Sequence, residues 1–310
     1  MIGERTTTLD GIDLTDASVW EKATPHDWLD RLRSEDPVHW HEESDGPGFW
    51  ALTKHDHVRR VSTSPGEFSS WAGGPLRLDP DPDSLEQLRM VIIGMDPPEH
   101  RTFRSIVSKA FTPKMIHELE NSLRAETRRV VGELRDSNRC EFVADVAARI
   151  PMWSISELMG VPGADRHRLY ELSHSLIDDQ DPEVAPTPET SMEASAEIYG
   201  YASEMAARER ANPTDSLTGL LLEAEVEGRK LTDMEFTLFF MFLIVAGNET
   251  TRTATSHGLL TLLDHPDALE RLVADPELTP GAVEEILRWE PPIHHFRRTA
   301  TTDVEPVSYT

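Results

Sequence analysis

One long apolar segment, from Thr232 to Leu263, constrains the fold of this chain more than any other feature. Thr232 followed three residues later by Glu235 is a capping box, which marks the start of a helix. His265-Pro266 marks its end, because a proline disfavours helical backbone at the residue before it. The segment therefore predicts a helix of about 30 residues and about 45 Å, long enough to cross a domain.

Polar residues interrupt the apolar centre of this helix. Phe236 to Ala246 is almost continuously apolar, as in a helix buried on all sides, and Gly247-Asn248-Glu249-Thr250-Thr251 follows. Glycine costs about 1 kcal/mol in a helix interior. One interpretation is a kinked core helix whose polar residues satisfy one another. The other is a site where a flat ligand lies over Gly247 while Glu249 and Thr250 handle protons.

Charge and apolar run lengths exclude several classes of partner. The net charge of −26 disfavours nucleic acid and anionic membrane surfaces. Met1 to Thr15 is polar, and the run from Phe236 is shorter than the roughly 20 residues of a membrane span, so we predict no membrane anchor and a cytoplasmic protein. The single cysteine, Cys140, excludes internal disulfides and a multi-cysteine metal site, and we expect it to be a small buried hydrophobe. No metal-ligand spacing is visible, so no metal-ligating residue is predicted from spacing.

The rest of the chain is predicted to be mainly helical with a small β-sheet. Residues 1–36 form a lead-in, and residues 37–310 form the main domain. Pro37 to His41 and Phe49 to Leu52 predict a β-hairpin, and Ile293 to Ala300 predicts a strand. The segment from Pro65 to Pro82 predicts a long, functional loop. The acidic connection from Asp178 to Pro188 is expected to be mobile.

Two further helices carry charged residues. Asp96-Pro97-Pro98-Glu99 predicts a helix start with Asp96 as its cap, and His100 and Arg104 then share a face. In so acidic a protein this basic cluster stands out, although taken alone it predicts a solvated face. A later helix from about 280 to 289 places Glu285 and Arg288 three apart, which taken alone predicts a surface ion pair.

Three motifs stand in order along the chain: Met95-Asp96-Pro97-Pro98-Glu99-His100, the Ala246 to Thr251 run, and Glu285-Ile286-Leu287-Arg288 with Pro291-Pro292 and Phe296-Arg297-Arg298-Thr299-Ala300-Thr301. Together they resemble a soluble bacterial cytochrome P-450, a haem-thiolate monooxygenase. The resemblance runs from roughly Pro37 to Glu305. It implies the fold of that family and haem as cofactor, with electrons from NAD(P)H delivered by a ferredoxin-type redox partner and a reductase.

The resemblance assigns roles residue by residue. Glu249 and Thr250 match the acid–alcohol pair that binds dioxygen and relays protons. Ala246 and Gly247 match the small residues that let the helix pass close over the haem. Three residues match the groups that bind the haem carboxylates in the family: His100, Arg104 and Arg298. Cationic donors of this kind pair well with carboxylates. Glu285 and Arg288 match a structural pair that the family buries in its core.

The expected substrate is a small apolar molecule. Residues at positions that contact substrate in the family are Trp71, Phe242, Val245, Ile293 and Phe296. The runs around Glu249 and Arg298 resemble family members that oxidise sterols and branched lipids. The basic helix near Arg101 and Lys109 could meet an acidic ferredoxin, because complementary charge steers such encounters.

One part of the family pattern does not match. The family's iron ligand is a cysteine well beyond the position of Arg298, where a thiolate favours O–O cleavage. The only cysteine here, Cys140, lies in a segment that does not match that loop. We therefore expect a cytochrome P-450 fold lacking its C-terminal haem-ligand region, by truncation, frameshift or an incomplete gene model, with apolar surface exposed on the long helix.

These observations leave three hypotheses about function. The first is a haem-dependent monooxygenase whose remaining part is supplied elsewhere. The second is a catalytically inactive remnant that still binds an apolar ligand. The third is a helical protein-interaction domain that folds without haem.

Overall fold

The computed structural model describes residues 9, 11–44, 46–76, 79–111, 113–135, 139–177, 187–226 and 228–304. Within them the chain forms two compact units, and each is described by itself. Unit 1 comprises Met1–Arg89, Ile93–Pro97 and His295–Thr310, and unit 2 comprises Met90–Ile92 and Pro98–His294. Most of the expected mobile connection, the start of the lead-in and the chain beyond residue 304 lie outside the described residues.

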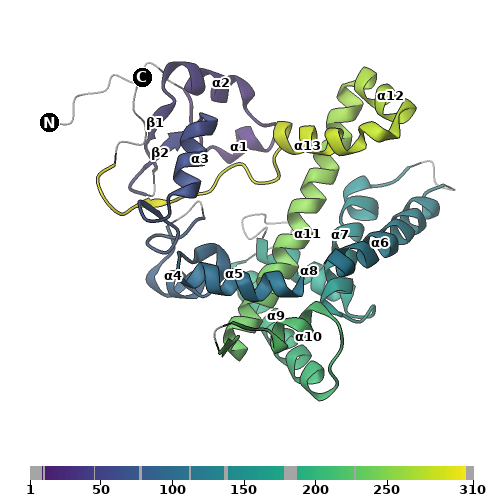
Figure 1. The fold of residues 1–310 in the computed structure, drawn as a ribbon. Helices are drawn as coiled ribbons and strands as arrows, with labels where there is room; N and C mark the ends of the chain where they lie inside the picture. Colours follow the sequence, from purple (N-terminus) through teal and green to yellow (C-terminus); the bar gives the residue numbers. More distant parts are fainter. Residues whose placement is uncertain are drawn as a thin grey trace. The chain divides into compact units, whose positions relative to one another are not determined.

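Unit 1 combines short helices with two small antiparallel sheets (Figure 1). Its helices are α1 (Ala17–Trp20), α2 (His26–Glu35), α3 (His55–Thr63) and α4 (Pro82–Arg89), with part of the 3-10 turn η1 (Ile92–Gly94). Its strands are β1 (Val38–His41), β2 (Phe49–Leu52), β3 (Phe68–Ser69) and β6 (Thr299–Ala300).

The predicted hairpin is confirmed. Strands β1 and β2 pair antiparallel, with Val38 opposite Leu52 and Trp40 opposite Trp50. Gly48 lies in the left-handed region with a φ of 81°, and a Cβ there would lie 2.6 Å from the Trp40 ring. Only glycine therefore fits at this end of β2.

The second sheet of unit 1 joins distant parts of the chain. Phe68 pairs with Ala300 and Ser69 with Thr299. The strand predicted from Ile293 to Ala300 is thus wrong over most of its length, because only Thr299–Ala300 finds a partner strand. The predicted loop from Pro65 to Pro82 contains β3, and its last residue begins α4.

Unit 2 is helical apart from one small hairpin, β4 (Glu225–Val226) with β5 (Arg229–Lys230). Its elements in chain order are α5 (Glu99–Ala110), α6 (Pro113–Glu133), the π-helical turn η2 (Val143–Ala147), α7 (Arg149–Met159), α8 (Arg166–Ile177), α9 (Pro188–Ala211), α10 (Leu217–Glu223), α11 (Asp233–Asp264), α12 (Pro266–Ala274), the 3-10 turn η3 (Pro276–Leu278) and α13 (Thr279–Trp289).

The central element of unit 2 is α11, which contacts α7, α8, α9, α12 and α13 (Figure 1). Its predicted capping box is confirmed: the Thr232 hydroxyl accepts from the Glu235 N–H at 3.2 Å, and the Thr232 N–H donates to the Glu235 carboxylate at 2.9 Å. Its apolar first half is fully buried at Phe236, Phe240 and Ile244. Burying each of these side chains contributes about 2–3 kcal/mol.

The second half of α11 is more open. Leu260 and Leu263 are each 58% exposed, as the sequence predicts for a long helix with uncovered apolar surface. Among the described helices, none is long and apolar enough to cross a bilayer. The mainly helical fold with a small β component is as predicted.

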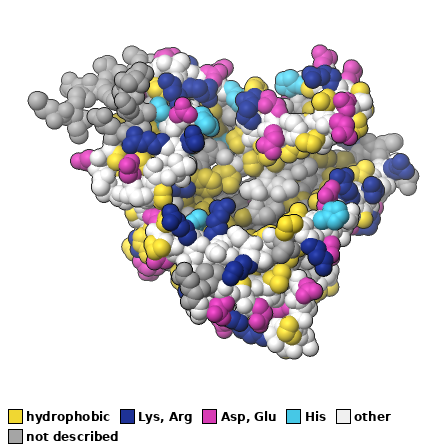
Figure 2. Space-filling view, in the orientation of Figure 1, with side chains coloured by type: hydrophobic (Ala, Val, Ile, Leu, Met, Phe, Trp, Pro, Cys, Tyr) yellow, Lys and Arg dark blue, Asp and Glu magenta, His cyan; other side chains and the backbone are white. Residues whose placement is uncertain are grey.

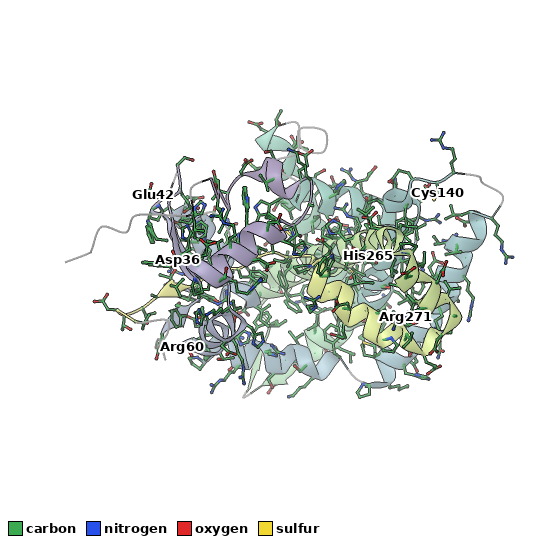
Figure 3. All side chains as sticks on the ribbon, turned by 90° about the horizontal axis from the view of Figure 1, so that it is seen from above. Asp36, Glu42, Arg60, Cys140, His265 and Arg271 are labelled. Atoms are coloured by element: carbon green, nitrogen blue, oxygen red, sulfur yellow. The ribbon has the colours of Figure 1, made fainter. Side chains whose placement is uncertain are left out.

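Two local predictions are wrong. Asp96 does not cap α5, whose N-cap position is Pro98 without a side-chain cap; the Asp96 carboxylate instead accepts from the Ser70 N–H at 2.9 Å and from the Ser69 hydroxyl. Cys140 is exposed rather than buried, because it lies in an irregular stretch before η2 (Figure 3).

Candidate active site

Thr250 lies half-buried in the middle of α11, and its hydroxyl is engaged within the helix. The hydroxyl donates to the carbonyl of Ala246 at 2.8 Å. This bond to the carbonyl four residues back loosens the helical ladder locally. The Thr250 oxygen keeps its lone pairs as acceptors for a proton from another donor.

Glu249 is buried beside Thr250, and Arg252 and Asn248 contact its carboxylate. Its carboxylate forms an ion pair with Arg252, three residues later on α11, and the two side chains are only 10% and 14% exposed. The Asn248 amide donates to the other carboxylate oxygen at 3.2 Å. Arg252 could have been found from its spacing, since residues three apart share a helix face, but the sequence motif drew attention only to the acid and the alcohol.

Asn248 links this group to α8. Its side chain is fully buried, and its amide nitrogen lies 3.4 Å from the Ser173 hydroxyl oxygen. The amide oxygen of Asn248 is buried and has no hydrogen-bond partner among the described residues. A buried oxygen without a hydrogen bond destabilises the fold unless a further donor reaches it. The polar group on α11, formed by Asn248, Glu249 and Thr250, can therefore accept one more hydrogen bond at this oxygen.

Gly247 and Ala246 complete the motif. A Cβ on Gly247 would lie 3.3 Å from two side-chain carbons of Ile155 on α7. Glycine here therefore lets α7 pack close to α11. The family resemblance predicts that Ala246 and Gly247, being small, let α11 pass close over a haem. That role stays a prediction.

A hollow of about 400 Å³ lies between α5 and α11, near the N-terminal side of the polar group. The edge-to-face contact of Phe103 with Phe239, at 5.2 Å between ring centroids, packs these helices together. Two predicted site residues meet here, the cationic Arg104 and the apolar Phe242. The full lining is Ile92, Arg104, Val107, Ser108, Phe111, Phe239, Phe242 and Leu243. The hollow is therefore open to solvent, with mainly apolar walls and one cation at its lining.

Three other predicted site residues belong to unit 2 and do not line this hollow. His100 is half-buried on α5, one turn before the exposed Arg104. Val245 is half-buried on α11, and Ile293 is exposed. His294 lies near Glu290 and His257; burial lowers the pKa of His294, while the Glu290 carboxylate raises it.

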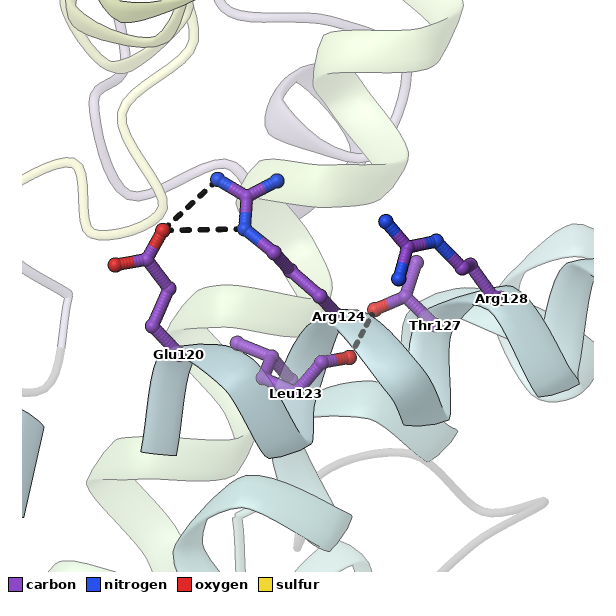
Figure 4. A pocket seen from close by; sticks show the side chains of 5 residues that line it. All are labelled: Glu120, Leu123, Arg124, Thr127 and Arg128. Carbon is purple, nitrogen blue, oxygen red and sulfur yellow. Dashed lines mark hydrogen bonds and ion pairs between the residues drawn. The ribbon is translucent and has the colours of Figure 1, made fainter. Parts of the chain in front are cut away.

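A second hollow, about 380 Å³, lies along α6 and contains none of the predicted site residues (Figure 4). It is lined by residues of this one helix: Glu120, Leu123, Arg124, Thr127 and Arg128. Arg124 donates to Glu120 at 2.9 and 3.1 Å, so each of these two charges is balanced by the other.

On the face shown in Figure 2, acidic and basic side chains are interspersed with hydrophobic ones.

Arg298 is the predicted carboxylate donor of unit 1. Its guanidinium is half-buried and donates to the carbonyl of Arg297 at 2.7 Å. Burial lowers the pKa of Arg298, while the nearby Asp96 carboxylate raises it. A half-buried cation of this kind suits an anionic partner.

Arg297, which the sequence did not single out, has several partners in unit 1. It forms ion pairs with Glu43 and Asp79 and lies over the ring of Phe49. Its partners come from distant parts of the chain, so no local signal marks it.

The two apolar residues predicted for unit 1 are both exposed. The guanidinium carbon of Arg89 lies 5.0 Å from the ring centroid of Trp71, within the range of a cation–π contact. Phe296 is also exposed. Their contact with a substrate stays a prediction.

Glu285 and Arg288 form the predicted pair on α13. Two hydrogen bonds of 2.7 Å join them, and each partner shifts the other's pKa, downward for Glu285 and upward for Arg288. The burial expected from the family is absent in the described residues, since the side chains are 61% and 62% exposed. No element of the described chain covers α13 on this side.

Comparisons with known proteins show which family the chain is similar to. A family model described as Cytochrome P450 matches residues 190–310. The methyl-branched lipid omega-hydroxylase of Mycobacterium bovis is 38% identical over 284 residues, covering 88% of this chain and 66% of the relative. The steroid C26-monooxygenase of Mycolicibacterium smegmatis is 35% identical over 302 residues, covering 94% of this chain and 70% of the relative.

Solved structures give the same result. A Mycobacterium marinum cytochrome P450 in complex with pseudoionone shares 34% identity and a TM-score of 0.85, covering 96% of this chain and 75% of the other. The present chain spans about two thirds of the length of the curated relatives it matches. With this extent of similarity in sequence and in fold, the chain belongs to the cytochrome P450 family.

Proposed function

We propose that this chain carries the dioxygen-facing part of a haem-dependent monooxygenase that hydroxylates an apolar small molecule. The observation that carries the proposal is the placement of Glu249 and Thr250 on α11, beyond an apolar hollow lined by Phe239 and Phe242. A buried acid beside a hydroxyl can hold and pass a proton.

The residues present fit a haem group by the chemistry of their donors. In unit 2, His100 and Arg104 on α5 are donors of the kind that binds a carboxylate in charge-assisted hydrogen bonds, and in unit 1 Arg298 is a donor of the same kind. Bound haem supplies the iron that activates dioxygen, with electrons that come from NAD(P)H through a reductase and a ferredoxin-type partner. We assign no iron ligand, because Cys140 is exposed in the stretch before η2.

Thr250 and Glu249 divide the proton handling between them. The Thr250 hydroxyl donates a hydrogen bond to the Ala246 carbonyl in the resting helix, and it must turn from that carbonyl to donate elsewhere. Glu249 must leave Arg252 before its carboxylate can accept a proton and pass it on. Both steps are rotations of side chains within one turn of α11.

The substrate is proposed to be a branched lipid or a sterol. The hollow has mainly apolar walls, which favour an apolar molecule. Two relatives carry names for action on methyl-branched lipids and on steroids. The exposed Arg101 and the surface Lys109 on α5 supply positive charge for an acidic redox partner.

The test is haem uptake followed by absorption spectroscopy of the reduced, carbon monoxide-treated chain. Haem uptake by this chain supports the proposal, as do a thiolate-type Soret band and hydroxylation of a sterol or branched lipid when a cysteine-bearing haem-ligand segment, reductase and ferredoxin are added. Failure to take up haem, or a histidine-type spectrum, overturns it for this chain.

A second candidate, a helical protein-interaction domain, is favoured by one observation. Leu260 and Leu263 expose apolar surface on α11, and such surface often marks a protein contact. This candidate predicts cooperative folding without haem and a stable complex with another protein. Circular dichroism and affinity capture on the haem-free chain distinguish it from the first.

A further inference from the structure

Arg297 and Arg298 are neighbours in the chain, yet their surroundings differ. Arg297 has two acidic partners and an aromatic ring, whereas Arg298 forms no ion pair with any residue that the structure describes, and its side chain donates to the carbonyl of Arg297. The two guanidinium groups are therefore expected to have different roles.

The charge of Arg297 is already compensated. One nitrogen donates to Glu43, and these side chains are 15% and 9% exposed. Another nitrogen lies 3.6 Å from the Asp79 carboxylate, and the guanidinium carbon is 4.8 Å from the Phe49 ring centroid. A planar guanidinium suits one carboxylate and one ring face at the same time, which a lysine cannot match. Arg297 has no room for a further anion without losing a partner.

The backbone on both sides of Arg298 is tied to the segment around β3. The Arg297 N–H donates to the carbonyl of Pro75 at 2.9 Å. Thr299 pairs with Ser69, and the Thr301 N–H donates to the carbonyl of Glu67 at 2.9 Å. The position of the Arg298 backbone therefore depends on these attachments.

Arg298 itself is less fully compensated. Its opposing acid, Asp96, already accepts from the Ser70 N–H at 2.9 Å and from the Ser69 hydroxyl. The Arg298 side chain has one hydrogen bond to the Arg297 carbonyl, so further N–H groups of its fork are left for a ligand.

We propose that Arg297 is a positioning residue, which through Glu43 and Phe49 fixes the strand that presents Arg298 to a carboxylate ligand. The inference rests on the proposed function in so far as the carboxylate is that of haem. Arg297 acts through Arg298 and touches no ligand.

The test uses metal-free protoporphyrin IX, which has two free carboxylates, and its dimethyl ester, which has none. Both are titrated by fluorescence into the full chain. The wild type is expected to bind the free acid roughly tenfold more tightly than the ester, as for one or two charge-assisted hydrogen bonds. Arg298→Gln is expected to lower this preference at least threefold.

Three variants separate positioning from simple charge. Arg297→Gln and Arg297→Lys are both expected to lower the preference at least threefold, although lysine keeps the charge. Glu43→Gln removes a negative charge, which on electrostatic grounds alone raises affinity for an acid; positioning predicts that it lowers the preference instead. Arg33→Gln, at an exposed cation of unit 1, is the matched control and leaves the preference unchanged.

A second readout is hydrogen exchange at the backbone amides of Arg297 and Thr301. Exchange is expected to be faster in Arg297→Gln and Glu43→Gln and unchanged in Arg298→Gln. If Arg297→Gln does not fold, Arg297→Lys and Glu43→Gln decide the question.

The outcomes distinguish two kinds of failure. A wild type with no preference for the free acid overturns the carboxylate part of the proposed function and this role with it. A wild type with the preference, combined with Arg297→Lys and Glu43→Gln that retain it, overturns this inference alone.

Discussion

The carboxylate of Glu249 pairs with the guanidinium of Arg252 one turn further along α11, and both side chains are almost fully buried. The acid assigned to proton transfer is thus held by a cation from its own helix. Its release depends on rotation of two side chains rather than on movement of another element.

Removing Arg252 tests how strongly this pair holds the helix. Arg252→Ala leaves a buried carboxylate without its cation, and we expect it to lower the free energy of unfolding by about 3 kcal/mol. Arg124→Ala on α6 is the control, because Arg124 and Glu120 are more than half exposed and such pairs contribute less than about 1 kcal/mol. Urea denaturation measures both, and equal losses would contradict the prediction.

The Thr250 hydroxyl has a matched counterpart in Thr255, which donates to the carbonyl of Thr251 at 2.7 Å. Because alanine favours helix by about 0.5 kcal/mol over threonine, Thr250→Ala and Thr255→Ala should each change the free energy of unfolding by less than about 1 kcal/mol. In the reconstituted reaction only Thr250→Ala should separate oxygen consumption from product formation. Unchanged coupling would remove Thr250 from the proposed proton handling.

Gly247 should not tolerate a methyl group. In Gly247→Ala the new methyl lies 3.3 Å from Ile155, and we expect a net loss of about 1 kcal/mol after the gain in helix propensity. Gly200→Ala on α9, where nothing lies within 4 Å of the new methyl, should stabilise by up to about 1 kcal/mol. Combining Gly247→Ala with Ile155→Val should cost less than the sum of the two, as thermal or urea unfolding would reveal.

His294 should make the fold sensitive to mild acid. Burial lowers its pKa in the folded state, so below the usual histidine pKa of about 6.5 the unfolded chain binds more protons and stability falls as the pH drops. The loss begins near that pH and ends below the folded-state pKa. In His294→Gln the decline of unfolding free energy between about pH 7 and 5 should be shallower, while His55→Gln, at an exposed histidine, should follow the wild type.

Cys140 should react readily with a thiol reagent in the native state, because it is exposed. The native rate is expected to lie close to the rate in denaturant, as followed by absorbance with a coloured disulfide reagent. Protection by more than about a hundredfold would mean that the thiol is buried in solution.

The parts of the fold set by local sequence were predictable. The capping box at Thr232 and the proline at 266 bound α11 because their partners lie within a few residues. Asp96 was misassigned, since the same carboxylate could cap a helix or reach Ser69, 27 residues back in the chain. Sequence spacing cannot choose between a local and a distant hydrogen bond.

The candidate site divides in the same way. The polar group on α11 was visible because its residues are consecutive, and Arg252 is one turn away. The surroundings of Arg297 were not, because its partner Glu43 is 254 residues distant. The exposure of Glu285 and Arg288 depends on which elements pack against α13. The three-residue spacing of the pair does not predict which elements those are.

The pairing of β3 with β6 has a consequence for the order of events during synthesis. The Thr301 hydroxyl bonds to the carbonyl of Gly66, 235 residues earlier, so unit 1 cannot close its second sheet until the ribosome has released almost all of this sequence. Closing so long a loop costs entropy that only later contacts offset. Unit 2 is contiguous apart from three residues and can assemble first, leaving the early strand β3 without its partner for most of translation and open to capture by a chaperone.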